Sequence, residues 1–147
     1  MNPINQGAKQ ANVDARFTTM LIIWFAMLMS VGTFFVIAQL VERQANAEGD
    51  GSTLVWILLA VGIMTLLASF LIKRKLLAQS VKEQRVDLVQ SAMIVALALC
   101  ESTSLFGLLA YFATGTRYYY IFFIIGVIGS LLHMPRRDQL LAASYKR

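Results

Sequence analysis

One carboxylate lies in the middle of an otherwise apolar segment of the sequence. Residues 94–112 read IVALALCESTSLFGLLAYF, and Glu101 is the sole charged residue between Asp87 and Arg117. A charged side chain at the centre of a membrane helix costs about 2.5–3.5 kcal/mol on insertion scales. We therefore expect the resting form of Glu101 to be the neutral acid, hydrogen-bonded to a hydroxyl or carbonyl group. Such a group can carry a proton when it meets water or a cationic partner; equally, it can be a fixed hydrogen-bonding group between helices or pair with an Arg of another subunit.

The groups that could support Glu101 are hydroxyls, because no Lys or Arg is expected at the same depth in the other apolar segments. The candidate supporting residues are Ser30, Thr33, Thr65, Thr103 and Ser104. His133 is expected near the inner end of its helix, about half a bilayer away from Glu101, and is not expected to pair with it. The sequence thus predicts a carboxyl group that has hydroxyl partners and no counter-charge of its own chain.

Other kinds of catalytic or metal-binding chemistry have little support in the sequence. It has no Gly-rich phosphate loop, no Ser/His/Asp arrangement and no Cys/His cluster. His133 is the one histidine and Cys100 the one cysteine, so we expect no metal site and no intramolecular disulfide, and we interpret Cys100 as a packing residue. We expect no catalytic activity of the chain's own, and no cofactor other than a bound proton or sodium ion.

The composition is that of an integral membrane protein. The chain has 147 residues, of which 58% are hydrophobic and 14% charged, and its mean hydropathy is +0.65; soluble domains of this size rarely combine these values. Four segments are long enough to cross a bilayer as helices, which takes about 17–25 residues: 17–41, 54–72, 88–116 and 118–134. These segments are apolar on every side, unlike the alternating strands of a membrane barrel. We therefore predict an all-α fold in which residues 1–147 form one domain of four transmembrane helices, arranged as two hairpins.

The basic residues predict the orientation of these helices. The N-terminal arm, the predicted loop 73–87 and the C-terminal tail hold 11 of the 13 Lys and Arg residues, and Arg43 and Arg117 are the other two. Because basic loops stay in the cytoplasm, we expect both termini and the 73–87 loop there, and residues 42–53 on the outer side. The net charge of +5 is then explained by topology and by attraction to anionic lipid headgroups, and it requires no nucleic-acid partner. The expected location is the bacterial inner membrane.

Small residues mark one face of the third predicted span. Ala96, Cys100, Thr103 and Gly107 follow one another at spacings of four, three and four residues, which places them on one strip of a helix. Another helix can approach such a strip closely. The sequence leaves open whether that helix belongs to the same chain or to another subunit, and we expect either a homo-oligomer or a complex with other membrane subunits.

The segment around Glu101 resembles a known family. The order of its residue types is similar to that of the carboxylate-bearing helix of the proteolipid, subunit c, of rotary ATP synthases and V-type ATPases. This order is an Ala-Leu run, a Glu, a small residue, a hydrophobic pair and a Gly. The matching positions here are Ala96–Leu99, Glu101, Ser102, Leu105, Phe106 and Gly107. Four spans in about 150 residues also resemble the duplicated V-type proteolipid. The resemblance implies proton or sodium transport by a ring of such subunits, with Glu101 as the ion-binding carboxylate; the alternative is a non-catalytic accessory subunit of a larger membrane complex, in which Glu101 has a structural role.

Overall fold

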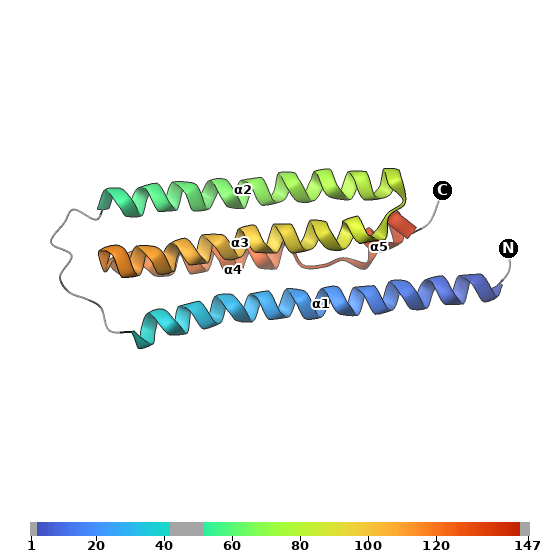
Figure 1. The fold of residues 1–147 in the computed structure, drawn as a ribbon, viewed down its shortest axis with the longest axis horizontal. Helices are drawn as coiled ribbons and strands as arrows, with labels where there is room; N and C mark the ends of the chain where they lie inside the picture. The colour runs from blue at the N-terminus through green and yellow to red at the C-terminus, as the bar shows by residue number, and fades with distance from the viewer. Residues whose placement is uncertain (1–2, 42–51, 145–147) are drawn as a thin grey trace.

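The described part of the chain is all-helical, as predicted. A computed structural model describes residues 3–41 and 52–144, with side chains from residue 12 onward, and it contains no strand in these ranges. The elements, in order, are α1 (Pro3–Leu40), α2 (Ser52–Glu83), α3 (Val86–Thr114), a 3-10 turn (Arg117–Tyr119), α4 (Tyr120–Leu132) and α5 (Arg137–Ser144) (Figure 1). Most of the predicted outer loop 42–53 lies outside the described residues.

Three helices are long and apolar enough to cross a membrane. They are α2, α3 and the part of α1 from Asn12 to Leu40. The fourth predicted span is shorter than expected, because α4 has 13 residues and reaches roughly 20 Å, against a hydrocarbon core of about 30 Å. Its continuation, α5, is bent from it by 45°. The described residues thus contain three candidate spans, or four if α4 and α5 are counted as one bent span.

Pro135 explains why the fourth apolar segment is broken. The amide of His133 donates to the carbonyls of both Gly129 and Ser130 as α4 ends, and proline then supplies no amide hydrogen and disfavours helical geometry at the preceding residue. The chain resumes as α5, whose Leu140 and Ala143 are fully buried. The segment Arg137–Ser144 is therefore a helix that packs against the rest of the bundle.

The connection between α2 and α3 is much shorter than the predicted loop 73–87. Helix α2 continues to Glu83, and Gln84, with a left-handed φ of 54°, ends it. Arg85 then forms an ion pair with Asp87, and this hydrogen bond raises the pKa of the exposed Arg85 guanidinium. The prediction was wrong because Lys, Arg, Gln and Glu are good helix formers, so charge marks where a helix leaves the lipid and not where it ends.

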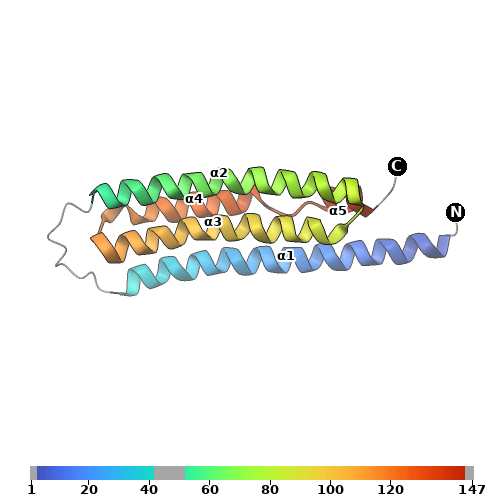
Figure 2. The same ribbon diagram turned by 45° about the horizontal axis from the view of Figure 1, so that its top comes forward.

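Helix α3 is the central element of the bundle. It packs against α1, α2 and α4, whereas the described parts of α1 and α2 do not contact each other (Figures 1 and 2). Helices α1 and α3 run in the same direction, and α2 and α4 run in the opposite one (Figure 1). The α2–α3 turn, α5 and the start of α1 lie at one end of the bundle, which we call the terminal end (Figure 1). The 3-10 turn lies at the opposite end.

At the terminal end, a core joins α5 to α1 and α3. Its buried members are Val13, Met20, Val89, Met93, Leu97, Leu140 and Ala143, and an ion pair between Arg137 and Asp14 joins α5 to α1 at its edge. Farther along the bundle, the Trp24 indole N–H donates to the Ser130 carbonyl over 2.8 Å, which links α1 to α4. Large apolar side chains such as Phe25, Trp56 and Met64 point outward, which suits a surface in contact with lipid.

Candidate ion-binding site

Glu101 lies near the midpoint of α3 and is bonded to α1. The Ser30 hydroxyl donates to Glu101 Oε1 over 2.5 Å, and the carboxylic side chain is partly buried at this contact. The two residues are 71 positions apart, and nearly the same offset recurs near the end of the helix pair, where the Tyr111 hydroxyl donates to the Val41 carbonyl over 3.0 Å. Parallel packing of α1 and α3 in this register therefore brings Ser30 to Glu101.

The Ser30–Glu101 pair is chemically suited to both protonation states of the acid. A hydroxyl can donate to an ionised carboxylate, and it can also accept from a protonated one. Across residues 12–41 and 52–144 the ion pairs are Arg85–Glu83, Arg85–Asp87 and Arg137–Asp14, so no basic side chain of these ranges lies within 4.0 Å of Glu101. The carboxyl group therefore has a hydroxyl partner and no counter-ion from the described chain.

The other predicted supporting hydroxyls do not contact the Glu101 carboxyl group. The Thr103 hydroxyl donates to the Gly62 carbonyl over 3.1 Å and lies 3.3 Å from the Thr65 hydroxyl, so these two threonines join α3 to α2. Thr33 is exposed and donates to the carbonyl of Met29 in its own helix. Of the five predicted supporting residues, the structure brings Ser30 to the site.

Ser104 is buried against α4. Its hydroxyl has no hydrogen-bond partner within the described structure. A methyl group added at Gly126 would occupy the place of the Ser104 hydroxyl and would lie 3.2 Å from the main-chain oxygen of Cys100. Ser104 therefore lies at a close approach of α3 and α4.

The strip of small residues on α3 faces helices of the same chain. Ala96, Cys100, Thr103 and Gly107 are all buried. A Cβ atom at Gly107 would lie 2.6 Å from Phe122 Cβ, and Thr103 bonds to α2 as described. The strip is thus covered by α2 and α4, which is the first of the two interpretations that the sequence left open.

A second buried polar cluster lies on the other side of α3, toward the terminal end. Ser69 Oγ is 2.8 Å from His133 Nε2, and the Lys73 ammonium donates to the His133 carbonyl over 3.2 Å. The Phe70 ring packs edge-on against the imidazole, with centroids 4.4 Å apart, and Cys100 Sγ lies 4.0 Å from Ser69 Oγ. Because Lys73 caps the end of α4, this cluster is accounted for by helix packing.

Sequence reasoning missed this cluster because it placed Lys73 in a loop and treated His133 as isolated. One signal could have revealed it. Ser69 and Lys73 are four residues apart, so they share a helix face if α2 extends past residue 72. The extension of α2 was the missing inference.

No group of three or more His, Cys, Asp or Glu side chains in the described ranges is arranged to hold a metal ion. Comparison with known proteins gave no further guide: no protein-family model, curated protein or solved structure matches this chain.

Proposed function

We propose that this protein is an integral membrane subunit that binds or relays a proton at Glu101. The observation that carries the proposal is the Ser30–Glu101 hydrogen bond at the middle of two apolar helices, with no counter-ion from the described chain. In this proposal α4 and α5 together cross the bilayer as a bent fourth span. The terminal end faces the cytoplasm of a bacterial cell, and the chain works in the inner membrane.

The Ser30 contact is compatible with a cycle between two states of the carboxyl group, because the hydroxyl can donate to the ionised form and accept from the neutral one. In the proposed cycle, water or a basic residue of a neighbouring subunit takes the proton. Glu101 is partly exposed at the surface of the bundle, so another subunit could approach it.

A proton is a better fit than a sodium ion. Hard cations such as Ca²⁺ and Mg²⁺ take six or more oxygen ligands, and the described polar contact of Glu101 is the one hydroxyl of Ser30. The resemblance to the proteolipid family supports an ion-binding role of Glu101 for either ion, and it adds the expectation of a ring. Because α2 and α4 cover the small-residue strip of α3, copies of the chain in such a ring would meet through the exposed faces of α1 and α2.

The experiment is a comparison of Glu101→Gln with wild type and with Glu83→Gln, an exposed carboxylate at the end of α2. Dicyclohexylcarbodiimide attacks protonated carboxyl groups in apolar surroundings, so we expect it to label Glu101 and to spare Glu83. In the assembled native complex, reconstituted into vesicles with a pH-sensitive dye inside, Glu101→Gln should assemble and abolish proton movement, because Gln keeps the shape and cannot titrate. Glu83→Gln should behave as wild type.

Two results would contradict proton transfer at Glu101. Full transport by Glu101→Gln would make the side chain a hydrogen-bonding group. Loss of assembly in Glu101→Gln would favour an ion pair with another subunit, since removal of one member of a buried pair costs about 3–5 kcal/mol.

A second candidate function is that of an accessory subunit of a larger membrane complex. The observation in its favour is the sparse packing of α1, whose most apolar stretch is 11% buried within the chain, against 44% for α3. A free apolar helix face suits contact with unrelated membrane subunits as well as with lipid. Electron microscopy of the native assembly separates the two: a closed ring of identical copies favours the proton-carrying subunit, and one copy beside unrelated subunits favours the accessory role.

A further inference from the structure

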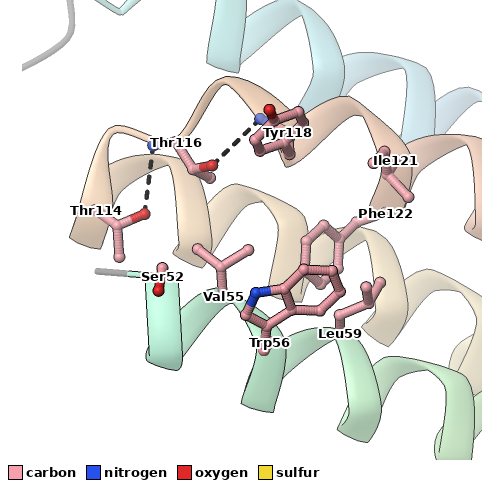
Figure 3. Close-up of a pocket in the computed structure, with 9 residues that line it drawn as sticks. All are labelled: Ser52, Val55, Trp56, Leu59, Thr114, Thr116, Tyr118, Ile121 and Phe122. Atoms are coloured by element: carbon pink, nitrogen blue, oxygen red, sulfur yellow. Dashed lines mark hydrogen bonds between the residues drawn. The ribbon is translucent and has the colours of Figure 1, made fainter. Parts of the chain in front are cut away.

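A cavity opens between α2 and the start of α4, at the end of the bundle opposite the terminal end. Its volume is about 540 Å³, within the range of about 300–1,000 Å³ that is usual for pockets that bind small molecules. Figure 3 shows the residues that line it: Ser52, Val55, Trp56, Leu59, Thr114, Thr116, Tyr118, Ile121 and Phe122. The site does not involve Glu101 and does not depend on the function proposed for it.

The lining of the cavity changes from polar to apolar along the bundle. The hydroxyl-bearing residues Ser52, Thr114 and Thr116 lie toward the end of the bundle (Figure 3). Leu59 and Phe122 lie deeper, and Phe122 belongs to a buried cluster with Leu58 and Ala110. A ligand that fills this space must be an amphiphile, with its polar group at the membrane surface and its apolar part toward the bilayer centre.

The mouth of the cavity is placed at the membrane interface. Trp56 and Tyr118 line it and remain 68% and 63% exposed, and Trp and Tyr are enriched at the level of lipid headgroups. Both rings border the exposed surface of the bundle. A lipid can therefore reach the cavity sideways from the leaflet in which α2 begins.

Within the residues that the structure describes, a positively charged residue neighbours the lining of the cavity in the sequence. Arg117 is exposed and stands in the sequence between Thr116 and Tyr118, two residues that line the cavity. It is the one basic residue at this end of the bundle within residues 12–41 and 52–144. An arginine at headgroup level favours a phospholipid of net negative charge over a zwitterionic one, whose own cation offsets the charge of its phosphate.

From these observations we infer that the cavity binds one acyl chain of an anionic phospholipid. The chain lies along Val55 and Leu59 and ends against Phe122, and the phosphate lies at Arg117. The lipid fills the gap between α2 and α4 near this end, so it is a bound component of the fold and not part of the exchanging lipid shell.

The test uses the full chain in nanodiscs that contain equal amounts of phosphatidylglycerol and phosphatidylcholine. A photoreactive diazirine near the end of an acyl chain is carried by a trace of one lipid or the other, and cross-linked peptides are identified by mass spectrometry. We expect labelling by the phosphatidylglycerol probe to concentrate on residues 55–59 and 118–122. It should exceed labelling by the phosphatidylcholine probe several-fold at these positions.

Variants of the residues that line the cavity test whether the labelling comes from a lipid bound there. Leu59→Trp fills the cavity and should reduce labelling there several-fold, whereas Leu67→Trp, an exposed position two turns farther along α2, should not. Ile121→Trp fills the cavity from the α4 side and serves as a second variant if Leu59→Trp fails to fold. Arg117→Gln should remove the preference for phosphatidylglycerol.

Three outcomes would overturn the inference. One is wild-type labelling spread evenly over the exposed faces of α1 and α2. Another is labelling at 55–59 that persists in folded Leu59→Trp and Ile121→Trp. The third is equal labelling by the two probes, since the inference requires an anionic headgroup.

Discussion

The side-chain nitrogen of Lys73 in α2 lies 3.2 Å from the main-chain oxygen of His133, just past the last residue of α4. Both residues are buried, and Ser69, one turn before Lys73, holds the imidazole of His133. A helix end exposes carbonyl groups without helical partners, and a cation near these groups is stabilising. The contact thus explains how α4 can stop inside the bundle, where water is scarce.

Replacement of Lys73 by Met tests this role. Met keeps most of the apolar stem and removes the donor, so the His133 carbonyl is left buried without its partner. An unsatisfied buried group costs about 1–3 kcal/mol. We expect Lys73→Met to lower the midpoint of thermal unfolding in detergent, measured by circular dichroism, and Lys75→Met, at an exposed position of the same helix, to leave it nearly unchanged. An unfolding midpoint of Lys73→Met equal to that of wild type would mean that desolvation of the ammonium cancels the benefit of the contact.

Gly107 should not tolerate a methyl group. A Cβ atom there would lie 2.6 Å from Phe122 Cβ and 3.1 Å from the Tyr119 carbonyl oxygen, so the main chain of the 3-10 turn would have to move. Overpacking of this kind typically costs about 1–3 kcal/mol. We expect Gly107→Ala to lower the unfolding midpoint.

Gly32→Ala is the matched control, because a Cβ atom at Gly32 meets nothing within 4 Å. Ala favours the helix over Gly by about 0.5–1 kcal/mol, so this substitution should be neutral or stabilising. Equal effects of the two substitutions would count against the close α3–α4 approach.

The helical class of the fold was predictable, because long segments that are apolar on every face are a strong signal of membrane helices. The first and last residues of each helix were less predictable. The 73–87 segment is charged, and charge alone does not distinguish the continuation of a helix from a loop. The shortness of α4 depends on Pro135 and on the Lys73 cap, and the cap joins residues 60 positions apart.

At the candidate site, the sequence singled out Glu101 by its charge and proposed five hydroxyls as partners. It could not choose among them, because a hydroxyl on an apolar helix looks the same whether it faces a neighbouring helix or bonds to its own main chain, as Thr33 does. The choice of Ser30 depends on the register of α1 against α3. That register follows from packing between helices, and no local pattern encodes it.

The energy of the Ser30–Glu101 bond can be measured with a double-mutant cycle. The four proteins are wild type, Ser30→Ala, Glu101→Leu and the double variant, and the readout is the free energy of unfolding in mixed detergent. Because a typical hydrogen bond contributes about 0.5–1.5 kcal/mol, we expect Ser30→Ala to cost that much in wild type and close to nothing when Glu101 is Leu. Thr33→Ala, an exposed position one turn away, should show no coupling to Glu101. A coupling of zero for Ser30 would contradict the α1–α3 register described above.

Accessibility of single engineered cysteines will decide how the bundle lies in the membrane. Native Cys100 is fully buried, so the wild-type chain should react little with a membrane-impermeant maleimide and provides the background. Arg117→Cys lies at one end of the bundle, and Glu83→Cys and Ala142→Cys lie at the other, all at exposed positions. The proposed orientation puts Arg117 outside, since basic segments stay in the cytoplasm. We expect Arg117→Cys to be labelled in intact cells, whereas Glu83→Cys and Ala142→Cys should be labelled only after the cells are permeabilised.

Labelling of Glu83→Cys in intact cells would reverse the orientation. Labelling of Ala142→Cys and Arg117→Cys, with Glu83→Cys protected, would show that α4 and α5 do not return across the bilayer.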